Sequence, residues 1–167
     1  MEKIRVIISN RQNDIKIPTG LRMVVRRCCN AVLKMEEFKG SVAVSVVFVS
    51  SEQIRQLNEK YRGKNVPTDV LSFPVNEERG IYDVDIETGE KLIGDVVISI
   101  ERAIDQSKKY GHSLQREVAY LTAHSVLHLL GYNHEEGLER VRMREKEEKV
   151  MTQLGLPGTS SYVLGDV

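Results

Sequence analysis

Three histidines in the C-terminal half of the chain carry its clearest chemistry. His124, His128 and His134 lie within eleven residues, and the whole chain has only four histidines. Because His124 and His128 are four residues apart, a helix presents both from one face, where they can bind one metal ion. Gly131 can end that helix in a left-handed conformation and bring His134 back to the same point. Three imidazoles suit zinc and leave a fourth position open for water, which is the arrangement of a catalytic site.

Two other interpretations of these histidines are structural. Lone histidines are usually satisfied core or surface residues, but three with this spacing across a helix end rarely coincide. A zinc ion that only holds a fold normally has four ligands, rich in cysteine, and no cysteine lies near the histidines in the sequence. We therefore predict a catalytic metal with zinc as the expected ion, one per chain; iron, nickel and copper accept the same ligands.

The elements that must position the histidines follow from the spacing of apolar residues. The stretch 114–130 is apolar on nearly every side, so we expect a central helix there. The acidic stretch 76–91 is expected to be a long connection or a hairpin excursion, at the rim of the site or moving as a lid. Strands are predicted over 4–8, 41–49, 69–75 and 93–100, and helices over 21–35, 51–61, 101–110, 114–130 and 139–154.

This order of elements predicts an α/β (α+β) fold. We expect a single compact domain over residues 1–155, with a small mixed β-sheet packed against a central metal-binding helix. Residues 156–167 are small and polar and are expected to form a flexible tail.

Composition limits the class of protein. With 167 residues, 41% of them hydrophobic and 29% charged, the chain can bury a core without disulfides. Its first apolar run is too short for a signal peptide or a membrane span, so a cytoplasmic location is expected. Cys28 and Cys29 are adjacent on a predicted helix and poorly placed to pair, which indicates small core residues in a reducing compartment.

Charge is balanced overall but unevenly distributed. Residues 1–64 carry 13 basic and 6 acidic side chains, for a net +7, whereas residues 65–100 carry 2 and 8, for a net −6. The basic part can engage phosphates locally, although the chain as a whole has no net attraction for nucleic acid. The alternative is an ordinary solvated surface.

The spacing of the histidines matches the His-Glu-x-x-His-x-x-Gly-x-x-His motif of metzincin proteases. Ser125 stands where those proteases have glutamate, the general base of peptide hydrolysis. Because serine has no useful pKa for that role, a zinc peptidase, or another metal hydrolase with a different base, becomes the second interpretation.

A more specific resemblance covers most of residues 45–150. His124-Ser-Val-Leu-His-Leu-Leu-Gly-Tyr-Asn-His134 resembles the His-Gly-x-Leu-His-Leu-x-Gly-Tyr-Asp-His signature of the YbeY-type metal-dependent endoribonucleases. The stretches 57–74, 92–99 and 110–117 agree in the same order. The resemblance implies a zinc-dependent, single-strand-directed endoribonuclease in bacterial ribosomal RNA maturation and ribosome quality control. The partners it implies are single-stranded ribosomal RNA, the small ribosomal subunit and its assembly factors, with no DNA and no membrane.

Arg62 is the candidate catalytic residue. It matches the arginine of the family's Tyr-Arg-x-Lys stretch, and a guanidinium can bind a phosphate through two hydrogen bonds. The alternative is that Arg62 and its basic neighbours only complement the C-terminus of a helix.

The chain departs from the family signature at two positions. Ser125 replaces glycine, and Asn133 replaces an aspartate that would bring negative charge near the metal. These changes bear on metal affinity or rate rather than on reaction class. A third interpretation of the chain is a ribosome-binding factor whose metal only holds the fold. Low aromatic content, 5% with no tryptophan, indicates that phosphate contacts rather than base stacking carry RNA recognition.

Four other polar residues are candidates for supporting roles. Glu117 lies two turns before His124, and we expect it to approach the site, to bond a histidine, or only to complement the helix dipole. Asp69 and Asp95 are candidates for orienting the histidines, or else are turn and strand-bulge residues. His112 is expected at the surface.

Overall fold

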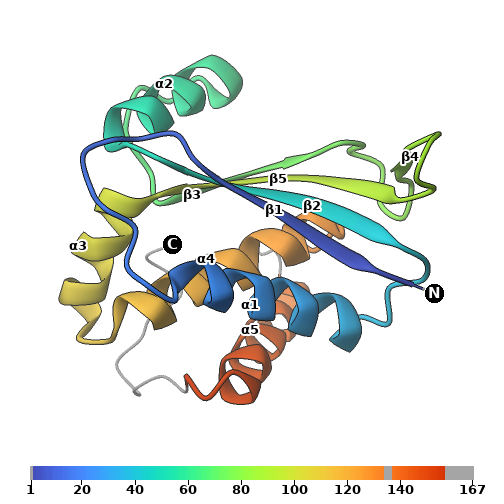
Figure 1. Cartoon of the computed structure of the whole chain (residues 1–167). Helices are drawn as coiled ribbons and strands as arrows, with labels where there is room; N and C mark the ends of the chain where they lie inside the picture. Colours follow the sequence, from blue (N-terminus) through green and yellow to red (C-terminus); the bar gives the residue numbers. More distant parts are fainter. Residues whose placement is uncertain (1, 134–136, 157–167) are drawn as a thin grey trace.

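A five-stranded mixed sheet organises the chain (Figure 1). The structure is a computed structural model and describes residues 2–133 and 137–156. β1, β2 and β5 run parallel in the order β1-β2-β5, while β3 and β4 both pair antiparallel with β5. The strands are β1 (Ile4–Asn10), β2 (Val42–Val49), β3 (Val70–Pro74), β4 (Asp83–Val84) and β5 (Lys91–Ser99).

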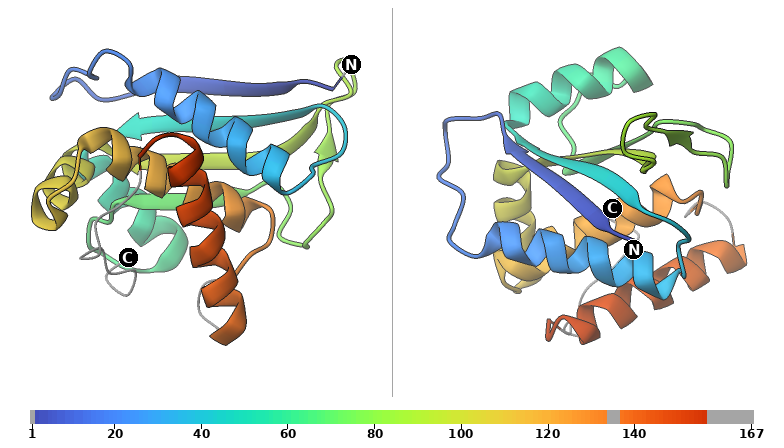
Figure 2. Two further views of the ribbon diagram at one scale, coloured as in Figure 1. Left: turned by 90° about the horizontal axis from the view of Figure 1, so that it is seen from below. Right: turned by 45° about the vertical axis from the view of Figure 1, so that its right-hand side comes forward.

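Helices cover the two faces of the sheet unequally. α2 alone lies on the upper face in Figure 1, whereas α1 and α4 pack beneath the sheet and α5 packs beyond them, as Figure 2 also shows. The helices are α1 (Leu21–Met35), α2 (Ser51–Arg62), α3 (Ile100–Tyr110), α4 (Leu114–Leu129) and α5 (Gly137–Gln153). Thirteen of the 16 residues of α4 are buried, which confirms its central place. The single compact α+β domain with a small mixed sheet is likewise confirmed.

Side-chain caps fix where the helices of the site begin. The Ser50 hydroxyl accepts the Gln53 N–H at 3.1 Å, and the Gln53 side chain accepts the Ser50 N–H at 2.7 Å, which forms a capping box at the start of α2. Ser113 caps α4 by accepting the Arg116 N–H at 3.1 Å. Gly63, with φ of 69°, ends α2 in the left-handed region.

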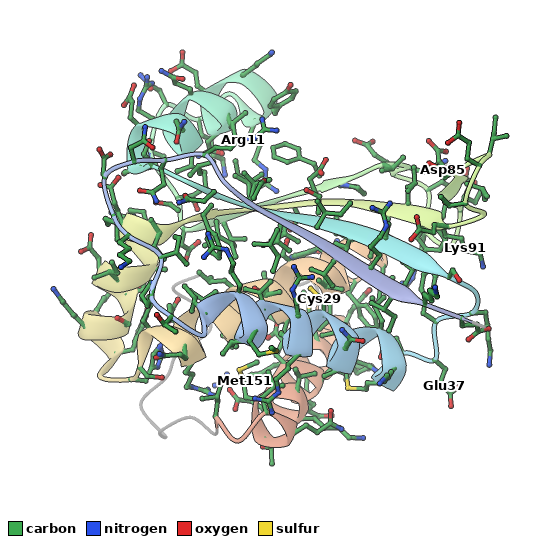
Figure 3. The ribbon with its side chains drawn as sticks, in the orientation of Figure 1. Arg11, Cys29, Glu37, Asp85, Lys91 and Met151 are labelled. Atoms are coloured by element: carbon green, nitrogen blue, oxygen red, sulfur yellow. The ribbon has the colours of Figure 1, made fainter. Side chains whose placement is uncertain are left out.

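Alternation along the strands separates two apolar clusters. In β2, Val44, Val46 and Phe48 face α1 and α4 and belong to the main core. Val47 and Val49 point to the opposite face of the sheet, toward α2, and belong to a smaller cluster. The main core includes Cys28 and Cys29, which are unpaired and fully buried; Cys29 is labelled on α1 in Figure 3. Burial raises the pKa of the Cys29 thiol to about 12, so both cysteines are inert core residues, as predicted.

The acidic stretch 76–91, between β3 and β5, was predicted to be a long connection or a hairpin. It contains a hairpin. Val84 pairs with Lys91 in the short strand β4, which the sequence pattern did not reveal. A bulge at Gly94 then shifts the register of β5 against β2, as one interpretation of that position predicted. Gly94 has φ of 139°, and a Cβ there would lie 2.3 Å from the Phe73 carbonyl oxygen, so only glycine fits.

Within the described residues, no helix is long and apolar enough to cross a membrane. The tail predicted over 156–167 lies outside the described residues from position 157 onward.

Candidate metal centre

The end of α4 is a Schellman turn centred on Gly131. Gly131 has φ of 100°; its N–H donates to the His128 carbonyl at 2.9 Å, and the Tyr132 N–H donates to the Leu127 carbonyl at 3.0 Å. The predicted left-handed glycine is therefore confirmed. His134, the predicted third ligand, lies outside the described residues and stays a prediction.

The other two histidines present matching nitrogen atoms to each other. His124 Nε2 and His128 Nε2 are 3.2 Å apart. Each ring is held through its other nitrogen, because His124 Nδ1 lies 2.5 Å from Glu147 Oε2 and His128 Nδ1 lies 2.7 Å from the Tyr132 carbonyl oxygen. A neutral histidine that donates from Nδ1 has its lone pair on Nε2.

The Nε2 lone pairs of His124 and His128 thus point toward one position between the rings. Glu147 and the Tyr132 carbonyl hold the two rings by accepting hydrogen bonds from Nδ1. This is the arrangement of histidines that bind a transition metal, so the donors fit zinc. The described residues supply two of the three predicted ligands, and they contain no group of three or more His, Cys, Asp or Glu side chains able to hold an ion.

Glu147 is the functional residue that the sequence analysis missed. It lies on α5 with a side chain only 1% exposed, and the Tyr120 hydroxyl donates to its Oε1 at 2.9 Å. A signal for it exists in the sequence, since Glu147 occupies the apolar stripe of α5 formed by Met143, Val150 and Met151. A lone carboxylate in such a stripe needs a buried partner.

A cleft of about 340 Å³ places Arg62 beside the two histidines. Arg62 is exposed at the last residue of α2 and lines the cleft together with His124 and His128 of α4. The structure thus brings Arg62 and two predicted ligands together. Arg62 is also the last residue of α2, so its alternative role, complementing the C-terminus of that helix, fits the structure as well. The cleft is lined by Asn58, Arg62, Lys64, Val66, Pro67, Thr68, Asp69, Val70, Ser72, His124 and His128.

The two aspartates fall on different sides of the sheet. Asp69 lines the histidine cleft and is 8% exposed, and burial raises the pKa of its carboxyl above the ordinary value. Glu147 and the Tyr132 carbonyl, not the aspartates, hold the histidine rings. Asp95 is exposed on the outer face of β5 beside Ser45 and Phe73, so of its two interpretations the orienting role was wrong.

His112 is not at the surface, contrary to expectation. Its side chain is 4% exposed, and its Nε2 lies 2.6 Å from Glu117 Oε1. Burial, with the nearby charge of Asp69, raises the pKa of Glu117 to about 8. Burial, with the charge of Arg116, lowers the pKa of His112. One of the predictions for Glu117 was a hydrogen bond to a histidine, and this is confirmed. The histidine is His112, which is not a predicted metal ligand.

The departures from the family signature have local partners. Ser125 is fully buried, and its hydroxyl lies 2.5 Å from the Ser72 hydroxyl on β3. The Asn133 N–H donates to Glu139 Oε1 at 3.0 Å, so a carboxylate from α5 lies beside the turn that lacks the aspartate.

The acidic segment 76–91 reaches the rim of the site through Arg79. Arg79 pairs with Glu139 at 3.3 Å and lies over the Tyr132 ring. Among the described residues, none from 76–91 lines the cleft, which agrees with the expected place at the rim.

Comparisons with known proteins support the family resemblance. The model of the family "Endoribonuclease YbeY" matches residues 7–155. Proteins named Endoribonuclease YbeY from Caldanaerobacter subterraneus subsp. tengcongensis and Thermoanaerobacter sp. (strain X514) are 52% and 49% identical over 157 and 158 residues. Each alignment covers 92% of this chain and 99% of the relative. The solution structure of TM1509 from Thermotoga maritima has the same fold, with a TM-score of 0.58 at 24% identity over 90% of this chain and 91% of that one. The chain therefore belongs to the endoribonuclease YbeY family.

Proposed function

We propose that this chain is a zinc-dependent endoribonuclease that cleaves single-stranded ribosomal RNA during ribosome maturation and quality control in the cytoplasm. The observation that carries the proposal is the convergence of His124 Nε2 and His128 Nε2, 3.2 Å apart, in a cleft that also holds Arg62. Relatives that share about half of the sequence are named endoribonucleases, which supports RNA as the substrate. The small ribosomal subunit and its assembly factors are the proposed partners.

His124, His128 and His134 would hold the ion. Zinc held in this way supplies Lewis acidity and a source of hydroxide near neutral pH. Glu147 and the Tyr132 carbonyl keep Nδ1 of the two described ligands occupied, so Nε2 stays available.

Arg62 supplies positive charge in the same cleft. Negative charge builds on the phosphoryl oxygens as the phosphodiester is cleaved, and the Arg62 guanidinium stabilises it through two hydrogen bonds. Asp69 lines the same cleft, and burial raises the pKa of its carboxyl above the ordinary value.

A peptidase role receives less support. The Ser125 side chain, in the place of the peptidase glutamate, is buried and bonded to Ser72, so it cannot act on a substrate in the cleft. The role of ribosome-binding factor with a purely structural metal is opposed by the open cleft beside the ligands.

The test is incubation of purified protein with an end-labelled single-stranded fragment of ribosomal RNA and, in parallel, with an unfolded peptide. Zinc-loaded protein, chelated protein and the His128→Ala variant are compared. We expect cleavage of RNA alone, by the zinc-loaded protein alone. Peptide cleavage would favour the peptidase, and no cleavage of either substrate would contradict a nuclease.

Arg62→Glu separates catalysis from metal binding. We expect this variant to lose cleavage while keeping bound zinc, measured by atomic absorption. Lys108→Glu on α3 is the matched control, because it makes the same charge change at an exposed site outside the cleft. Full activity of Arg62→Glu would remove Arg62 from the mechanism.

A further inference from the structure

A second, larger hollow lies on the outer face of the sheet, away from the histidines. It measures about 980 Å³ and is bounded by the four long strands below and by α2 on one side. Arg11, at the end of β1, lies beneath α2 in Figure 3. We call this hollow the outer groove; it is lined by Ile7, Ser9, Arg11, Ser45, Val47, Val49, Gln53, Gln56, Leu57, Lys60, Tyr61, Phe73, Asp95 and Val97.

An aromatic side chain stands open at the wall of the outer groove. Tyr61 is 58% exposed, and Phe73 supports it edge-on, with ring centroids 5.2 Å apart at 67°. The Lys60 ammonium lies 5.2 Å from the centroid of the Tyr61 ring. An exposed aromatic ring next to a cation is the combination on which proteins stack the bases of single-stranded nucleic acid while binding the adjacent phosphate.

Basic charge prevails along the groove. Arg11 and Lys60 are both exposed, and Asp95 is the one acidic residue among the lining residues. The surface therefore favours a polyanion that also carries flat apolar groups, and RNA satisfies both conditions.

The outer groove shares two walls with the histidine cleft. On α2, Lys60 and Tyr61 face the groove, while the next residue, Arg62, lines the cleft. On β3, Phe73 faces the groove, while its neighbour Ser72 lines the cleft. A strand that crosses the C-terminal end of α2 can therefore contact both hollows.

A peptide added as a strand is a poorer occupant because the adjacent sheet edge is partly covered. β1 is an edge strand, and the simplest way to bind a peptide is to add it there as a further strand. The Arg26 guanidinium already donates to the Val6 carbonyl at 2.7 Å, which occupies one backbone acceptor of β1. Such capping protects an edge from strand addition.

We propose that the outer groove binds single-stranded RNA that flanks the cleavage position, with Tyr61 stacking on a base and Arg11 and Lys60 contacting phosphates. The inference rests on the proposed endoribonuclease function and adds a second RNA-binding surface to it. It also refines the expectation that base stacking contributes little, since one exposed ring is enough for one stacked base.

The test measures binding of fluorescent single-stranded RNA to the full chain by anisotropy, with a chelator present so that RNA stays intact. Oligonucleotides of about 12 and about 4 nucleotides are compared, because longer RNA can span both hollows. The variants are Arg11→Glu with Lys60→Glu, and Tyr61→Ala. Lys108→Glu with Lys109→Glu on α3 is the matched control, since both lysines are exposed and lie outside the groove.

We expect the Arg11 and Lys60 double variant to bind the longer RNA at least about ten-fold more weakly. Its slope of log affinity against log salt should also fall by about 1.4, the value for two lost phosphate contacts. Tyr61→Ala should weaken binding roughly five- to ten-fold with an unchanged salt slope. The ratio of affinities for long and short RNA should fall in both, and the control should match the unaltered protein.

Groove variants that bind the longer RNA like the control would overturn the inference while leaving the proposed endoribonuclease in place. Variants that keep RNA affinity but lose co-sedimentation with ribosomal subunits would assign the groove to a protein partner instead. An unaltered protein that neither binds nor cleaves RNA would overturn the proposed function itself, so the two failures are distinguishable.

Discussion

Two buried histidine–glutamate pairs along α4 use the same chemistry for different ends. His124 meets Glu147 through Nδ1 at 2.5 Å, whereas His112 meets Glu117 through Nε2 at 2.6 Å. In the first arrangement, Nε2 of His124 points into the cleft toward Nε2 of His128. In the second arrangement, the carboxylate of Glu117 is bonded to Nε2 of His112. Only His124 therefore presents its second ring nitrogen to another histidine in the cleft.

The surroundings of the two carboxylates differ as well. Glu147 accepts a second hydrogen bond, from the Tyr120 hydroxyl. Glu117 has Asp69 nearby, and burial and that charge raise its pKa to about 8. Since the pKa of His112 is lowered by burial, the His112–Glu117 pair favours its uncharged form. One pair holds a proposed metal ligand, and the other joins the start of α4 to the residues before it.

The largest difference between the pairs should appear when the histidines are removed. His124→Ala should lose bound zinc and reduce RNA cleavage by more than about 100-fold. This loss is larger than the roughly 10- to 100-fold loss expected when a group that only orients a metal ligand is removed. His112→Ala should keep its zinc while losing about 1–3 kcal/mol of stability, because Glu117 is left buried without this partner. Metal content by atomic absorption and urea unfolding measure the two effects; zinc loss in both variants would erase the distinction.

Removing the carboxylates should give a smaller contrast of the same kind. Glu147→Gln should lower zinc affinity about 10- to 100-fold, because the amide supports His124 less well than a carboxylate does. Glu117→Gln should leave zinc affinity unchanged. Competition with a chromogenic chelator measures both. Equal affinities in the two variants would mean that Glu147 has no special bearing on the ligand.

Titration should separate the pairs further. The pKa of Glu117 is raised from 4.5 to about 8, so the folded state binds its proton more tightly than the unfolded state does. The stability from this group is complete below pH 4.5 and is lost as the pH rises through 8. We expect stability to fall by at least about 1 kcal/mol over this range of pH. Urea unfolding against pH should show this decline in the unaltered protein and not in Glu117→Gln.

The smallest effect should come from Ser125, the neighbour of His124. Ser125→Gly removes the hydroxyl bonded to Ser72 and places glycine within a helix, at a cost of about 1 kcal/mol. Zinc affinity should stay within about three-fold, since the hydroxyl faces β3. Thermal unfolding and chelator competition give the two values, with Ser72→Ala as the companion variant. A gain in zinc affinity would mean that the serine perturbs the ligand beside it.

Features set by neighbouring residues could be predicted from the sequence. The apolar spacing gave α1 its observed bounds, Leu21–Met35, and the pair Ser50 and Gln53 marked the start of α2. Gly131 and the spacing of His124 and His128 likewise depend on one helix and its end. The two-residue strand β4 was missed because it is exposed and has no apolar pattern to reveal it.

Features set by distant residues could not be predicted in the same way. Glu147 is 23 residues from His124, and only the packing of α5 on α4 brings them together. His112 was placed at the surface because it precedes a helix cap, yet the chain turns it inward onto Glu117. Asp95 looked like Asp69 in sequence, but the alternation of β5 puts it on the other face of the sheet.

The position of Glu147 has a consequence for biosynthesis. The ring of His124 is held by a carboxylate that is synthesised 23 residues later and lies on the last helix of the described chain. While the polypeptide is still emerging, the histidines exist but lack the support that α5 gives them. An enzyme that cleaves RNA is synthesised on the ribosome, which is itself built of RNA, and this order of synthesis delays a fully supported centre until α5 has been made.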